Sequence, residues 1–241
     1  MDVDSTYGQV IRLPKREVSR GRDTDRRSVP PSLTDVLCEK PADPSATGFL
    51  IASLPDTSGP ILWVQDHSSR RENGHLYTPS LTAYGINRPF LQVHVSHPRD
   101  VLWAMEEGAA CAGLSAVIGE IHGAPAVLDF TATKRLAMRG DASGVPIYLI
   151  RSGDPGVLSA ARMRWRVTSL PSARLPQDSQ APGLPQWDVN LFRARGREPG
   201  RWVAQYDPDT KRTADRLNLV SRADIGKMDT SDKPVSDRAG G

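Results

Sequence analysis

The strongest constraint on the fold is an alternation of short apolar runs with helical segments in the middle of the chain. Residues 98–111 and 131–143 each place apolar and small side chains on one face of a helix. Strands that are joined through helices pair in parallel, and the helices then cover the faces of the sheet. The sequence therefore predicts an α/β fold built on a parallel sheet flanked by helices. The apolar runs of strand length are residues 61–64, 89–95, 114–121 and 145–151.

Both helical segments carry boundary signals. Asp100 can cap the start of the first helix, and Gly113 follows it as a stop signal. Asp129 or Thr131 can cap the second helix, and Gly144 ends it. Each helix is therefore expected to connect two neighbouring buried strands.

After residue 160 the pattern changes, because polar and apolar residues now alternate with a period of two. This alternation is typical of antiparallel strands with one face in solvent. Trp165, Trp187 and Trp202 are expected to face inward, and residues 195–200 are expected to form a hairpin loop. The sheet is thus predicted to begin parallel and to be extended by antiparallel strands. The segments with this alternation are residues 162–170, 186–195 and 200–207.

The two ends of the chain are rich in charge and poor in large apolar residues. Residues 1–30 contain seven Lys/Arg and five Asp/Glu, and residues 207–241 contain seven Lys/Arg and seven Asp. Such segments cannot bury enough apolar surface to offset the loss of chain entropy on folding. We therefore expect a disordered N-terminal arm over 1–30, one domain over 31–206 and a disordered tail over 207–241.

Several classes of protein and site have no support in the sequence. There is no run of about 18 apolar residues and no apolar N-terminal segment, so we expect no membrane span and no secretory signal. The two cysteines lie far apart and form no metal-binding motif with histidine. His94 and His97 lie where a strand ends, which does not favour a shared metal ion. The expected location is the cytoplasm, and no metal site is expected.

The order and spacing of these segments resemble the ImuA family, which are RecA-like accessory proteins of damage-induced mutagenesis in bacteria. The combination LWAMEE, VIGE, LDFTATKRL and RWRV, in this order, carries the resemblance. It implies a RecA-like core whose parallel sheet is extended by antiparallel strands at the C-terminal end. The similar segments are residues 59–64, 76–95, 101–121, 128–151, 163–172 and 187–203.

The phosphate-binding loop of a RecA-like core is the feature that the sequence lacks. A working loop reads GxxxxGK[ST], and its glycines, lysine and hydroxyl hold phosphate and Mg²⁺. The corresponding stretch, residues 39–58, offers Gly48 but no Lys or Arg between Pro41 and Asp66. Asp43 and Asp56 would repel a triphosphate. We therefore predict a degenerate phosphate loop and no bound cofactor.

Glu120 falls where the acidic residue that ends a strand would hold Mg²⁺ or polarise water in a RecA-like ATPase. Without a phosphate cradle this carboxylate has no nucleotide to act on, and it can equally be a strand-end carboxylate with a local hydrogen-bond partner. Gly48 and Glu120 are therefore interpreted as remnants of a nucleotide site. We expect no catalytic residues, so the chain is not expected to be an enzyme.

Arginine is concentrated toward the C-terminal end of the domain. Residues 158–202 contain eight Arg, no Lys and three acidic residues. Guanidinium groups suit phosphate oxygens or carboxylates, so the pattern predicts a surface for DNA or for an acidic protein. A simple solvated face remains the alternative. The arginines that alternate along two neighbouring strands are Arg162, Arg164, Arg166, Arg193, Arg195 and Arg197.

The resemblance implies a non-catalytic adaptor in SOS-induced, error-prone translesion DNA synthesis. Such an adaptor would link an ImuB-like Y-family polymerase relative to an error-prone polymerase III alpha-type subunit. RecA and DNA are further candidate partners, and the protein would join the nucleoid when DNA is damaged. Two alternatives stay open at this point: a divergent RecA-like ATPase and a cell-division inhibitor resembling SulA.

Overall fold

The computed structural model describes residues 32–55, 57–173, 178, 181–196, 198–210 and 216–221. The helices are α1 (Ser45–Ser53), α2 (His67–Asn73), α3 (Thr78–Ala83), α4 (Pro98–Ala109) and α5 (Phe130–Ser143). The strands are β1 (Leu33–Cys38), β2 (Ile61–Asp66), β3 (Phe90–Val95), β4 (Ala116–His122), β5 (Ile147–Ser152), β6 (Met163–Ser169), β7 (Gln186–Ala194), β8 (Gly200–Tyr206) and β9 (Leu217–Ser221).

All of these strands belong to one mixed sheet in the order β3-β2-β4-β5-β1-β6-β7-β8-β9. Neighbouring strands from β3 to β6 pair in parallel, and those from β6 to β9 pair antiparallel. The predicted α/β class, with a parallel sheet extended by antiparallel strands, is confirmed. The finer assignment of the core as RecA-like stays a prediction.

The predicted antiparallel strands over residues 162–170, 186–195 and 200–207 are confirmed, because β6 pairs with β7 and β7 with β8 in antiparallel order. On its other side β6 pairs in parallel with β1, where Val36 lies opposite Trp165. The reason is the connection from β5 to β6, residues 153–162, which returns across one face of the sheet before β6 starts. A strand that follows such a crossover runs parallel to its neighbour.

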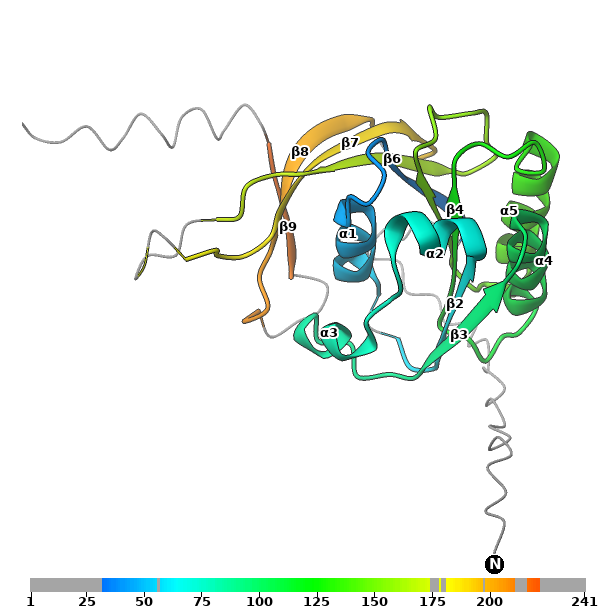
Figure 1. The fold of residues 1–241 in the computed structure, drawn as a ribbon, viewed down its shortest axis with the longest axis horizontal. Helices are drawn as coiled ribbons and strands as arrows, with labels where there is room; N and C mark the ends of the chain where they lie inside the picture. Colours follow the sequence, from blue (N-terminus) through cyan, green and yellow to red (C-terminus); the bar gives the residue numbers. More distant parts are fainter. Residues whose placement is uncertain are drawn as a thin grey trace, which may run out of the picture.

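Helices cover both faces of the sheet (Figure 1). α4 and α5 lie side by side on one face, and Met105 and Leu136 are fully buried there against β2, β4 and β5. α1 lies on the other face, where strands β6 to β8 curve around it (Figure 1). Phe49 of α1 packs 5.3 Å from the ring of Trp165 and 6.4 Å from that of Trp187. The antiparallel strands therefore form part of the core around α1.

The boundary signals were read correctly for α5 and incorrectly for α4. Asp129 caps α5 by accepting a hydrogen bond from the Ala132 amide at 2.7 Å, and Gly144 ends it in the left-handed conformation. α4 instead begins at Pro98, so Asp100 lies within its first turn and does not cap it. Proline fits the first turn of a helix because its missing N–H has no partner there.

Some elements were not predicted at all. β1 holds Thr34 and Asp35 among apolar residues, yet all six of its residues are buried because it lies between β5 and β6. α1 occupies part of the stretch interpreted as a degenerate phosphate loop, and α2 and α3 fill the connection between β2 and β3. No helix of the described residues is long and apolar enough to cross a membrane.

The expected disordered tail was wrong in part, because β9 adds a further strand to the sheet. Its residue Val220 lies opposite Val203 of β8. Leu217 and Leu219 pack against the core around α1. The expected arm over 1–30 and the tail from residue 222 onward lie outside the described residues, and the structure does not test them.

Candidate functional site

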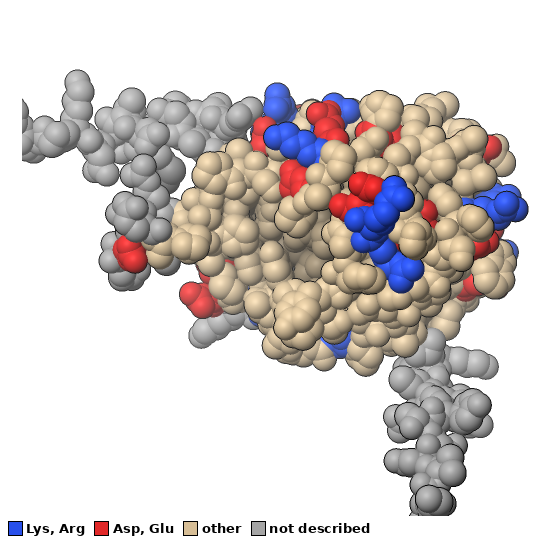
Figure 2. All heavy atoms as spheres, in the orientation of Figure 1, with Lys and Arg blue, Asp and Glu red and all other residues tan. Residues whose placement is uncertain are grey.

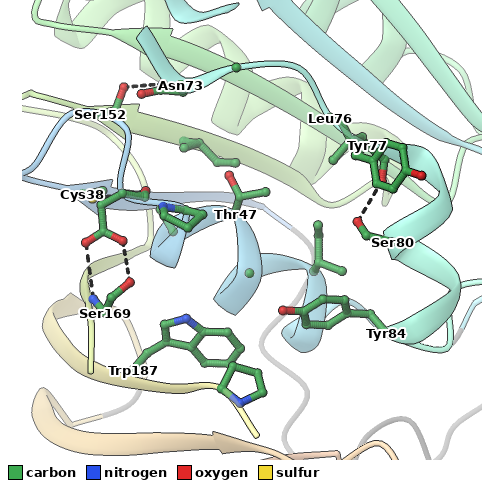
Figure 3. A pocket seen from close by; sticks show the side chains of 18 of the residues that line it. Cys38, Thr47, Asn73, Leu76, Tyr77, Ser80, Tyr84, Ser152, Ser169 and Trp187 are labelled. Carbon is green, nitrogen blue, oxygen red and sulfur yellow. Dashed lines mark hydrogen bonds between the residues drawn. The ribbon is translucent and has the colours of Figure 1, made fainter. Parts of the chain in front are cut away.

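A hollow of about 440 Å³ opens at the carboxyl ends of β1, β4 and β5. It lies between α1, the segment around α2 and α3, and the β6–β7 connection (Figure 3). In α/β sheets, ligands bind beyond the carboxyl ends of the strands. Figure 2 shows that this face is largely uncharged, with Lys, Arg, Asp and Glu side chains grouped at its margin. This hollow, which we call the carboxyl-edge hollow, is therefore the first place to look for a ligand site.

The loop between β1 and α1 closes one end of this hollow. The thiol of Cys38 donates to the carbonyl oxygen of Lys40 at 3.2 Å, so the loop turns carbonyl oxygens toward the strand end. Burial raises the pKa of this thiol, which keeps it protonated. Lys40 itself is exposed. A phosphate cradle needs backbone N–H groups directed inward, whereas here the carbonyl oxygens of Lys40 and Asp43 face the Cys38 thiol at the strand end.

The carboxylate of Asp43 accepts hydrogen bonds at the start of α1. It accepts from the Ser45 amide at 2.9 Å. It also accepts from the Ser169 hydroxyl at 2.6 Å, as the dashed lines at Ser169 in Figure 3 indicate. Partial burial acts to raise the pKa of Asp43, but these hydrogen bonds outweigh it and hold the pKa below its ordinary value. The protein thus places its own negative charge beside the helix N-terminus, which is where an anion is best stabilised.

Gly48 lies inside α1, one turn beyond the loop that it was expected to belong to. A Cβ atom built on Gly48 would lie 2.9 Å from Cζ2 of Trp187. The absence of a side chain therefore lets the indole ring of Trp187 pack directly against the helix backbone. This contact explains the glycine through packing, without any role in holding phosphate.

Glu120 lies on β4 and lines the floor of the hollow, with 3% of its surface exposed. Its Oε2 accepts from Nε2 of Gln65 at 2.7 Å, and its Oε1 accepts from Nδ2 of Asn73 at 2.8 Å. Burial raises the pKa of Glu120 to about 7, although these two hydrogen bonds act to lower it. Near neutral pH this carboxyl group is therefore partly protonated, and it lies between two amide donors.

The arginines predicted to form a basic surface have different environments, and Arg164 is not available to a partner. Arg164 is 4% exposed, and its Nε lies 3.1 Å from Oδ2 of Asp35. Arg151 contacts the same oxygen at 3.0 Å and also pairs with Asp154. Nη2 of Arg164 donates to the carbonyl of Val157 at 2.8 Å, because the 153–162 connection covers this side chain. Predicting Arg164 as a binding residue was wrong.

Arg162, directly before β6, and Arg166, on β6, are partly exposed, but each has an acidic partner. Arg162 pairs with Asp141 of α5 at 2.6 Å, and Arg166 pairs with Glu39 at 2.9 Å. The guanidinium groups of Arg164 and Arg166 also lie about 5 Å above the ring of Phe192. These interactions hold the side chains in place and leave little charge for a ligand.

Arg193 and Arg195 are the exposed members of the predicted set. Within the described part of the chain, neither makes an ion pair with a carboxylate. Together with Arg162 they line a second hollow of about 300 Å³, whose other walls are the small residues 160, 161 and 194. Arg197 lies outside the described residues. We call Arg162, Arg193 and Arg195, with this hollow, the arginine surface.

The described residues contain no group of three His, Cys, Asp or Glu side chains that could hold a metal ion. The ring of His94 instead packs against that of His75, with centroids 5.9 Å apart. His97 immediately precedes α4.

Sequence reasoning missed the buried ionic cluster of Asp35, Arg151, Asp154 and Arg164. Two signals were present: one carboxylate within the apolar run LTDVLC, and one arginine at the end of the buried run IYLIR. A charge inside a buried strand requires a partner of opposite sign. The pairing could have been suspected, although the sequence does not show which strands become neighbours.

No protein-family model matches the sequence. The chain is similar to Protein ImuA of Caulobacter vibrioides, strains NA1000 / CB15N and ATCC 19089 / CIP 103742 / CB 15. Identity is 32% over 168 residues, which cover 65% of this chain and 64% of each relative. The match thus spans slightly less than two thirds of the relatives' length. This similarity supports the resemblance to the ImuA family that was read from the sequence.

Proposed function

We propose that this protein is an accessory protein of SOS-induced, error-prone translesion DNA synthesis and that it acts by binding other molecules. The similarity to Protein ImuA supports the pathway. The partners that fit this role are an ImuB-like Y-family polymerase relative and an error-prone polymerase III alpha-type subunit. RecA and DNA are further candidate partners.

The chemistry of the carboxyl-edge hollow favours a binding protein over an ATPase. Phosphoryl transfer requires cations and inward-facing N–H groups around the transferred phosphate. In the described residues, no Lys or Arg lines the hollow, whereas Asp43 and Glu120 both do. A triphosphate would therefore meet carboxyl groups in place of compensating charge.

The observation that carries the proposed role is the arginine surface. Arg193 and Arg195 are exposed on β7 and just beyond it, beside a hollow with small side chains for walls. Arginine presents a planar fork of donors that fits carboxylate or phosphate oxygens. Long cations at a recess that pair with no carboxylate of the described residues are suited to docking an acidic group of a partner or a DNA backbone.

Reversing this charge is expected to weaken binding without unfolding the protein. The variant Arg193→Glu/Arg195→Glu should bind its target at least about tenfold more weakly, since each lost charged hydrogen bond is worth about 1.5–3 kcal/mol. Its melting temperature should stay within about 2 °C of wild type, because exposed substitutions usually change stability little. Fluorescence anisotropy with single-stranded DNA and pull-down with the two purified polymerase-type partners provide the measurements.

The matched control is Arg71→Glu/Arg99→Glu, which makes the same change in net charge at exposed positions on α2 and α4. It should retain full binding. The dependence on salt separates DNA from protein, because phosphate contacts release counterions and weaken steeply with salt. Equal binding of the two double variants to every target would show that the arginine surface is only a solvated face.

A further inference from the structure

The carboxyl-edge hollow has the size and walls of a site for a small organic molecule. Its volume of about 440 Å³ falls within the usual range of roughly 300–1,000 Å³ for ligand pockets. Tyr77 and Tyr84 flank α3 and Trp187 lies on β7, and Figure 3 shows the rings of Tyr84 and Trp187 on opposite sides of the cavity. Aromatic walls of this kind favour a flat guest that can stack.

The floor of the hollow is rich in hydrogen-bond acceptors. Glu120 contributes two oxygens, and each accepts one hydrogen bond from a protein amide while retaining a free lone pair. Oε1 of Gln65, a residue only 2% exposed, has no hydrogen-bond partner within the described part of the chain. A buried polar atom without a partner costs free energy, and a guest that donates N–H groups would recover it.

The charge of the lining restricts the guest further. The lining includes two carboxyl groups, from Asp43 and Glu120, and no Lys or Arg side chain of the described residues. A phosphate group would therefore be repelled, whereas a neutral or cationic amino group would be attracted. Size, aromatic walls, acceptors and charge all select the same chemical class.

We propose that the hollow bounded by α1, the α2–α3 segment and the β6–β7 connection binds a planar, amino-bearing heterocycle that carries no phosphate. The aromatic rings of the walls stack on the guest, and its amino group donates to Gln65 and Glu120 on the floor. This site is separate from the arginine surface, so the proposal does not depend on the proposed role in translesion synthesis.

The test compares nucleosides that differ in one amino group, titrated into the full-length protein by calorimetry. Guanosine and adenosine carry the exocyclic amine, and inosine and purine riboside are their counterparts without it. We expect at least one amino-bearing nucleoside to bind, and to bind at least about tenfold more tightly than its counterpart, as one good hydrogen bond to a charged group allows. The corresponding triphosphate should bind more weakly than the nucleoside.

Two variants locate the binding. Thr47→Phe places a ring inside the hollow from α1 and should abolish binding, whereas Thr131→Phe adds the same ring on the exposed side of α5 and should leave it unchanged. Glu120→Gln should weaken binding while the protein stays folded. The proposal is overturned if no amino-bearing nucleoside binds, if binding survives Thr47→Phe, or if the triphosphate binds more tightly than the nucleoside.

Discussion

Replacing Asp35 with alanine is expected to lower the free energy of unfolding by about 3–5 kcal/mol. Asp35 is fully buried on β1, and its Oδ2 lies 3.0 Å from Arg151 and 3.1 Å from Arg164. Removing it leaves two guanidinium groups close together in the core, with Asp154 as the remaining carboxylate beside Arg151. Desolvation lowers the pKa of Arg164, but an arginine remains charged at any accessible pH. The penalty is therefore that of an uncompensated buried charge.

Denaturation in urea, followed by circular dichroism, measures this loss. Asp141→Ala is the matched control, because Asp141 pairs with Arg162 at the surface and is partly exposed. Surface ion pairs contribute about 0–1 kcal/mol, so the control should lose no more than that. Equal losses in the two variants would contradict the buried ionic cluster that links β1, β5 and β6.

The stability of the protein should also depend on the ionisation of Glu120. Its pKa is raised from an ordinary value of 4.5 to about 7, mainly by burial. As the pH rises through 4.5, the unfolded chain loses the proton while the native protein keeps it, so the unfolded state gains stability. The contribution of Glu120 is therefore fully present below pH 4.5 and is lost as the pH rises through about 7. The difference amounts to roughly 3 kcal/mol, at 1.36 kcal/mol per pKa unit.

Glu120→Gln removes the titration and keeps the size of the side chain. The measured quantity is the free energy of unfolding of wild type minus that of the variant, between about pH 4 and pH 8. This difference should fall by roughly 3 kcal/mol over that range and then level off. A flat difference would show that the carboxyl group titrates near its ordinary pKa and is therefore well solvated.

Strong periodicity made part of the fold predictable from the sequence. The continuous apolar run around β4 and the alternating run of β7 were both predicted. A strand that is buried on both faces has a continuous apolar sequence, and a strand that is buried on one face alternates between apolar and polar residues. β1 was missed because Thr34 and Asp35 interrupt its apolar pattern, although β1 lies in the middle of the sheet. Local pattern does not report which strands are neighbours, and here the neighbours provide the partners for a buried charge.

The exposure of a site residue could be predicted only where it follows from the alternation of side chains along one strand. The exposure of Arg193 and Arg195 follows from alternation along β7 and the turn after it. The burial of Arg164 does not, because it depends on pairing with Asp35 of β1, which lies 129 positions earlier in the sequence. Gly48 was assigned to a phosphate loop because its role depends on Trp187, which lies 139 positions further along the sequence. Non-local packing decided both cases.

The central claim is that the protein works by binding partners and that its carboxyl-edge hollow does not accept a nucleoside triphosphate. Titration of the full-length chain with Mg·ATP, by calorimetry together with an assay of phosphate release, tests this most directly. The account predicts no saturable binding at millimolar nucleotide and no phosphate release above that of buffer. Micromolar affinity for Mg·ATP that disappears in Glu120→Gln, with turnover by the pure wild-type protein, would contradict it.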